Sequence, residues 1–127
     1  MRRQYHFRPS PDGLRAWDVH RLIRLTHGLP VEQVPLTAIT ELDTPYWYDE
    51  ESDRPTCRSI AAHMKLVDAA DLAYPIILCP QGRVMDGMHR IVKALVAGAD
   101  SVRAYRLPEL PAPDHVGVDP DDLPYDD

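Results

Sequence analysis

The residues Asp86 to Arg90 combine side-chain types that bind phosphate groups. Residues 84–85 are typical of the end of a short strand, and the spacing of apolar residues over 91–98 predicts a helix just after the turn. The first backbone N–H groups of such a helix are free to donate to an anion. Gly87 would let a ligand approach the backbone because it has no Cβ, and Arg90 could donate two hydrogen bonds to phosphate oxygens. The turn is therefore a candidate phosphate site.

The same spacing also fits a purely structural corner between a strand and a helix. In that alternative Arg90 forms a surface ion pair and binds no ligand. Glycine-containing turns before helices are common, so the spacing alone leaves both interpretations open.

A longer segment around this turn, residues 75–90 with the sequence PIILCPQGRVMDGMHR, resembles the core of the ParB/sulfiredoxin superfamily. Members of that superfamily place a Gly-x-x-Arg turn at a helix start and bind nucleotide phosphates there. The Asp-Gly-x-His-Arg form is most similar to the small ParB-like kinases that phosphorylate free serine. Sulfiredoxins carry a nucleophilic Cys where this chain has Met88, so sulfinic-acid repair is not expected. The resemblance covers residues 34–107 and is specific only over 75–98.

This resemblance implies a nucleotide-binding phosphotransferase that uses ATP or ADP with Mg²⁺ and acts on a small hydroxyl-bearing compound. The phosphates would be held by the amides of Gly87 and Met88 and by the side chains of His89 and Arg90. Asp86 would bind Mg²⁺ or orient the hydroxyl, so Asp86 and His89 are candidate catalytic residues. The alternative is a nucleotide-gated ParB-like regulatory or DNA-associated module without catalytic turnover.

Glu41 is the candidate catalytic base, because the serine-kinase relatives carry a Glu shortly after the first strand of the core. Its structural alternative is an acid that accepts hydrogen bonds from loop backbone. Thr56, Arg58 and Ser59 are second-rank candidates for contacts to ribose or phosphate, because in the superfamily this helix start faces the phosphate turn.

The helices and strands that must position these residues are predicted from the spacing of apolar residues and from the residues typical of turns and helix ends. The pattern predicts helices over 14–27, from Thr56 onward and over 91–98, and strands over 34–39, 75–79 and 101–107. The helix after Thr56 is expected to bury Ile60, Met64 and Val67. The segment 40–56 has no regular pattern and carries aromatic residues that either cover a ligand or pin the loop. This order predicts an α+β domain, a ParB/sulfiredoxin-like small mixed sheet flanked by helices.

The composition divides the chain of 127 residues into a domain over 1–107 and a tail over 108–127. The tail holds seven of the 20 acidic residues and no Lys or Arg, and its Pro and Asp content predicts a poorly ordered or extended segment. The remainder is close to neutral, so DNA is a possible partner but not the favoured one.

Two cysteines without an export signal favour reduced thiols in a cytoplasm. No apolar run is long enough to span a membrane, and no Cys/His spacing predicts a metal site. The oligomeric state is left open by the sequence.

Overall fold

The strands form two separate sheets in the computed structural model, which describes residues 4–48 and 54–125. The first sheet is antiparallel, in the order β1 (Tyr5–Arg8), β2 (Arg15–Asp18) and β7 (His115–Val116). The second is in the order β3 (Glu32–Pro35), β6 (Ser101–Arg106), β4 (Ile76–Leu78) and β5 (Val84–Asp86). Only β4 and β6 pair in parallel among these strands, so this sheet is mixed.

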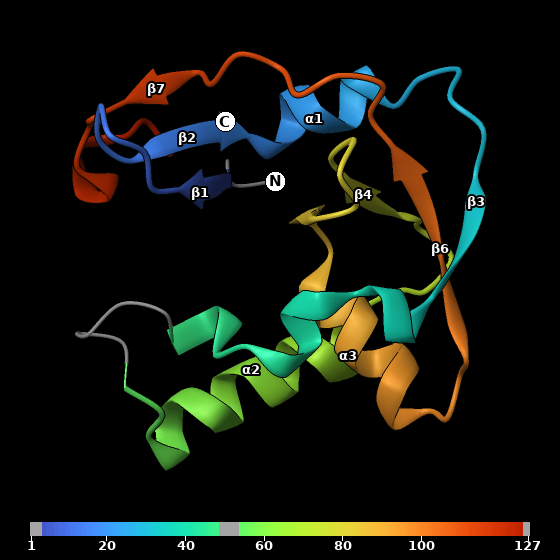
Figure 1. Ribbon diagram of the computed structural model, residues 1–127. Helices are drawn as coiled ribbons and strands as arrows, with labels where there is room; N and C mark the ends of the chain where they lie inside the picture. Colours follow the sequence, from blue (N-terminus) through green and yellow to red (C-terminus); the bar gives the residue numbers. More distant parts are fainter. Residues whose placement is uncertain (1–3, 49–53, 126–127) are drawn as a thin grey trace.

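Among the described residues three α-helices accompany the sheets: α1 (Val19–Leu25), α2 (Cys57–Ala69) and α3 (Met88–Val96). The expected α+β class is therefore confirmed, with a small mixed sheet as its centre. In Figure 1 the first sheet and α1 lie at the top, α2 and α3 lie at the bottom, and β4 and β6 lie between them. None of the described helices has the length and apolar character needed to cross a bilayer.

Strand β4 lies between two core clusters and is buried on both faces. Ile76 and Leu78 belong to a core cluster with α3, while Ile77 and the following Cys79 belong to a second cluster around Trp17. A strand covered on both sides has no polar alternation, which accounts for its continuous apolar sequence.

The N-terminal segment differs from the predicted helix over 14–27. Its first part forms β2, and α1 begins only at Val19, where the Asp18 carboxylate accepts a hydrogen bond from the His20 N–H. Trp17 is fully buried within the molecule instead of lying at the edge of a helical stripe. Pairing of β2 with two neighbouring strands and burial of this large side chain outweigh a local helical preference.

The strand expected over 34–39 is shorter than predicted. β3 ends at Pro35, and a 3₁₀ turn (Leu36–Ala38) follows it. The helix after Thr56 does begin as expected, with a capping box in which Thr56 and Ser59 bond each other's backbone N–H groups. Its expected buried stripe is wrong, however, because none of the residues of α2 is buried.

The segment after Leu107 also differs from a poorly ordered tail, because its described residues pack on the first sheet. β7 pairs with β2, and the Trp17 indole N–H donates to the Pro111 carbonyl over 2.8 Å. Leu123 is only 4% exposed. The extended conformation that the sequence suggests is thus combined with specific tertiary contacts.

Candidate functional site

The turn between β5 and α3 requires a glycine for steric reasons. Gly87 has φ +113°, and a Cβ at this position would lie 2.6 Å from Cγ2 of Ile76. Gly87 is also the N-cap of α3, so no side chain there accepts a hydrogen bond from the first N–H groups of the helix. The start of α3 consequently offers backbone donors, as a phosphate site needs.

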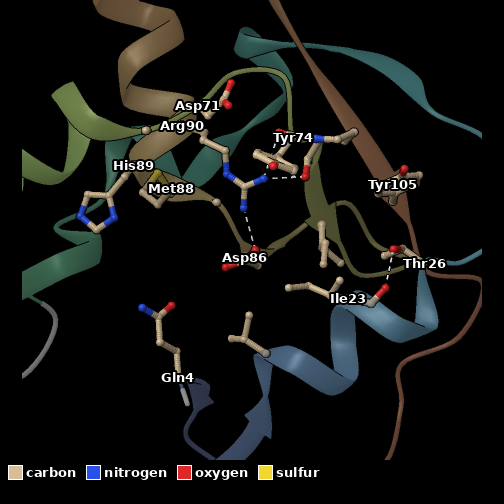
Figure 2. Close-up of a pocket in the computed structure, with 15 residues that line it drawn as sticks. Gln4, Ile23, Thr26, Asp71, Tyr74, Asp86, Met88, His89, Arg90 and Tyr105 are labelled. Carbon is tan, nitrogen blue, oxygen red and sulfur yellow. Dashed lines mark hydrogen bonds and ion pairs between the residues drawn. The ribbon is translucent and has the colours of Figure 1, made fainter. Parts of the chain in front are cut away.

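Arg90 is engaged within the protein. Its guanidinium donates to the Asp86 carboxylate over 2.7 Å and to the carbonyl oxygens of Tyr74 and Pro75 over 2.9 Å and 2.7 Å. The ion pair of the structural alternative is therefore present, but it is mostly buried, with the Arg90 side chain 17% exposed. Arg90 thus fastens the start of α3 to the chain before β4, and Figure 2 shows these three contacts as dashed lines.

Asp86 is the carboxylate nearest to the start of α3 in the sequence. Burial raises the pKa of its carboxyl, while the charge and the hydrogen bond of Arg90 oppose that rise. A carboxylate with a raised pKa accepts a proton more readily at neutral pH than an ordinary Asp does. The roles expected of Asp86, binding Mg²⁺ or orienting the substrate hydroxyl, stay predictions.

His89 lies in a cluster of three rings. Its Nε2 is 2.9 Å from Nδ1 of His63, and the Trp47 ring stacks on both imidazoles with centroids 4.7 Å and 4.1 Å away. Burial lowers the pKa of both histidines, and the neighbouring His63 lowers that of His89 further. A histidine with a lowered pKa is neutral at neutral pH, so His89 could bind phosphate as a hydrogen-bond donor and not as a cation.

A cleft of about 700 Å³ opens beside this turn. One wall is formed by residues 86–90, and the opposite wall by Val19 and Ile23 of α1 and by Thr26, which follows that helix. Tyr74 and Tyr105 are among the other lining residues. Figure 2 shows Asp86 in the middle of this cleft, between the start of α3 and Ile23 of α1. The volume is in the range typical of small-molecule sites, and the walls combine apolar surface with a few polar groups.

Glu41 is buried, and its Oε2 accepts a hydrogen bond of 2.7 Å from the Val84 N–H. The other oxygen, Oε1, has no hydrogen-bond partner among the described residues. Glu41 does not line the cleft described above. The structural alternative expects Glu41 to bond loop backbone, whereas its partner here is the backbone of strand β5. The role of Glu41 as a base stays a prediction.

The second-rank candidates at the start of α2 also lie outside the lining of this cleft. The side chains of Thr56 and Ser59 are used in the capping box, and the Ser59 hydroxyl also contacts the Tyr48 hydroxyl. Arg58 is exposed. It is His63, inside α2, that reaches the start of α3.

One polar cluster could not be expected from the sequence. Arg8 in β1 donates from Nε to the His6 imidazole over 2.9 Å, and burial, reinforced by the Arg8 charge, lowers the pKa of His6 to about 3. Tyr46, after the turn that holds Glu41, has its pKa raised to about 12 by burial and by the charges of Glu41 and Asp86. His6 and Arg8 are neighbours on one strand, but Tyr46 feels the charges of Arg8 and Asp86 from distant parts of the sequence, and no sequence signal marks such a cluster.

No group of three or more His, Cys, Asp or Glu in the described parts of the chain is arranged to hold a metal ion. Mg²⁺ needs only one or two carboxylates when phosphate oxygens and water supply its other ligands, and Asp86 could provide one.

Comparisons of the chain with protein-family models, curated proteins and solved structures find no match. The resemblance to the ParB/sulfiredoxin superfamily stays an expectation from the sequence motif, which none of these comparisons supports.

Proposed function

We propose that this protein is a ParB-like nucleotide-binding phosphotransferase that binds a nucleoside di- or triphosphate at the start of α3. The observation that supports this most is an α-helix start without a side-chain cap that opens into a cleft of about 700 Å³. Backbone donors in such a place attract anionic oxygens, and the partial positive charge of the helix start adds to that attraction.

Other residues of the cleft are suited to the metal ion and the base of a nucleotide. Asp86 would hold Mg²⁺, because only its Oδ2 is bound to Arg90 and a cation can share the carboxylate. Mg²⁺ neutralises phosphate charge and orients the reacting groups, which is most of what phosphoryl transfer requires. Ile23 and Tyr105 offer apolar and aromatic surface on which a base can pack.

In the transfer step the substrate hydroxyl would attack the terminal phosphorus and lose its proton, while the bond from that phosphorus to the bridging oxygen breaks and the shortened nucleotide leaves with the bond's electron pair. A carboxylate within hydrogen-bond reach can accept that proton, and because Asp86 already holds Arg90 and would hold Mg²⁺, Glu41 stays the proposed base although it does not line the cleft. Arg90 would then act mainly by fixing Asp86, since the two side chains are joined by a 2.7 Å contact.

Calorimetric titration with ATP, ADP, CTP and GTP, each with and without Mg²⁺, tests the binding. We expect at least one nucleotide to bind, and Asp86→Asn to remove the part of the affinity that depends on Mg²⁺. Asp100→Asn, an exposed acid outside the cleft, is the matched control and should bind as the unmodified protein does. Failure of all four nucleotides to bind would refute the proposal.

The second candidate, a nucleotide-gated module without turnover, is favoured by the contacts of Arg90. A ligand that draws Arg90 toward a phosphate would release the carbonyl groups of Tyr74 and Pro75 and so change the chain before β4. Nucleotide consumption with a panel of small hydroxyl compounds separates the two functions. Product formation that Asp86→Asn abolishes supports the enzyme, whereas binding without any product supports the module.

A further inference from the structure

His63 of α2 and His89 at the start of α3 contact each other through their ring nitrogens. Nδ1 of His63 lies 2.9 Å from Nε2 of His89, and the two ring planes are inclined by only 22°. The indole of Trp47 stacks on both rings, with centroids 4.1 Å from His63 and 4.7 Å from His89. The two imidazole centroids are only 5.2 Å apart, so both rings lie on the same face of the indole and meet edge to edge. The contact therefore lies near the plane of both rings, as a hydrogen bond between imidazoles requires.

This contact determines which nitrogen of His89 is left for a ligand. Its Nε2 is used by His63, whereas its Nδ1 has no hydrogen-bond partner among residues 4–48 and 54–125. Nδ1 is bonded to Cγ and is therefore the ring nitrogen closer to the main chain. His89 lines the cleft as the second residue of α3, whose start has no side-chain cap. An anion bound by the first N–H groups of α3 is thus within reach of Nδ1, while Nε2 faces α2.

The protons of the two imidazoles can be arranged in two ways. Burial lowers the pKa of both histidines, so both are neutral at neutral pH and each carries one N–H. When His63 donates from Nδ1 to Nε2 of His89, the N–H of His89 is on Nδ1 and can donate to a phosphate oxygen. When His89 donates from Nε2 instead, its Nδ1 carries a lone pair, which repels a phosphate oxygen. A phosphate at the start of α3 is compatible only with the first arrangement.

We propose that His63 is a positioning residue of the nucleotide site: its Nδ1–H donates to Nε2 of His89, so that His89 presents an Nδ1–H group to a phosphate oxygen. This inference rests on the proposed function, because the phosphate belongs to the nucleotide. Trp47 supports the arrangement by holding both rings in one layer. His63 does not line the cleft itself and lies 26 residues before His89, so it acts on the ligand only through His89.

Two substitutions of His63 separate its hydrogen bond from the packing of its ring. His63→Phe keeps an aromatic ring against Trp47 but has no N–H, whereas His63→Asn keeps an amide N–H near the position of Nδ1 but has no ring. Calorimetric titration uses the nucleotide that binds most tightly among ATP, ADP, CTP and GTP, with Mg²⁺. His63→Phe should weaken binding by about three- to tenfold, and His63→Asn should bind nearly as tightly as the unmodified protein. His115→Phe, on β7 and outside the cleft, is the matched control and should leave binding unchanged.

Nitrogen NMR of the nucleotide-bound protein tests the proton positions directly, because a protonated ring nitrogen and a bare one differ strongly in chemical shift. We expect an N–H at Nδ1 of both histidines and a bare Nε2 on His89. A proton on Nε2 of His89 would overturn the inference. So would a His63→Phe variant that binds as tightly as the unmodified protein, or a His63→Asn variant as weak as His63→Phe; in these cases the nucleotide still binds and the proposed function stands. If the unmodified protein binds none of the nucleotides, the proposed function fails and this inference fails with it.

Discussion

Replacement of Gly87 by alanine tests whether the turn before α3 requires a glycine for steric reasons, independently of any ligand. The backbone of Gly87, at φ +113°, lies where residues with a Cβ are strained, which costs about 1–2 kcal/mol. The added Cβ would lie 2.6 Å from Cγ2 of Ile76 and 2.9 Å from its Cβ, and Ile76 is fully buried. Overpacking of this kind costs a further ~1–3 kcal/mol, so we expect Gly87→Ala to lower the free energy of unfolding by about 2–5 kcal/mol.

Gly98, just beyond the other end of α3, provides the matched control. It also has a positive φ, +81°, but a Cβ there would meet no atom within 4 Å. Gly98→Ala should therefore cost only the backbone strain of about 1–2 kcal/mol. Urea unfolding followed by tryptophan fluorescence gives both values, and their difference measures the contact with Ile76.

A double-mutant cycle sharpens this test. Ile76→Ala removes Cγ2 and costs stability through the cavity it leaves, yet in the Gly87→Ala background it also relieves the closest contact. The double variant should therefore be more stable than the sum of the two single effects predicts. Equal destabilisation by Gly87→Ala and Gly98→Ala, within about 0.5 kcal/mol, would refute this reasoning.

Three further changes have expected outcomes that unfolding experiments can measure. Truncation after Leu107 should cost about 3–5 kcal/mol, because it removes the buried Leu123 and the backbone partner of a buried indole; a loss below about 1 kcal/mol would contradict this. The pKa of His6 is about 3 in the folded protein and near 6.5 in the unfolded chain, so between these pH values the unfolded chain binds the proton more readily. The contribution of His6 to the free energy of unfolding is therefore complete above pH 6.5 and is lost as the pH falls toward 3, by up to about 1.4 kcal/mol per pH unit. His6→Gln should reduce that slope in a pH series of urea titrations, and an unchanged slope would exclude this source. Glu41→Ala should cost about 1–3 kcal/mol by leaving the Val84 N–H without its acceptor, and Glu41→Gln should cost less; equal costs would show that the bond does not contribute.

The elements around the turn were predictable because their signals are local. The apolar run of β4, the Asp-Gly turn and the amphipathic start of α3 each lie within a few residues of one another. The capping box of Thr56 is likewise a short-range pattern, and it is present as expected.

What the sequence missed depends on contacts between distant segments. Glu41 bonds to Val84, 43 residues away, and no periodicity reports such a pair. The two-residue strand β7 has no pattern of its own and exists only because β2 offers it a partner. The stripe on α2 was recognised as apolar, but an apolar stripe does not say whether the chain itself covers it.

The first sheet has a consequence for the order in which the molecule folds. A chain that leaves the ribosome from its N-terminal side exposes the β1–β2 hairpin and Trp17 long before residues 77–107, which pack on the indole, and residues 111–116, which bond the indole and pair with β2, are available (Figure 1). A two-stranded hairpin is barely stable alone in water. Closure of this sheet spans nearly the whole described chain and must therefore come late, so the nascent chain carries an uncovered indole and an unpaired strand edge during most of its synthesis. Such intermediates are typical substrates of chaperones, which makes the yield of folded protein sensitive to how fast the last segment arrives.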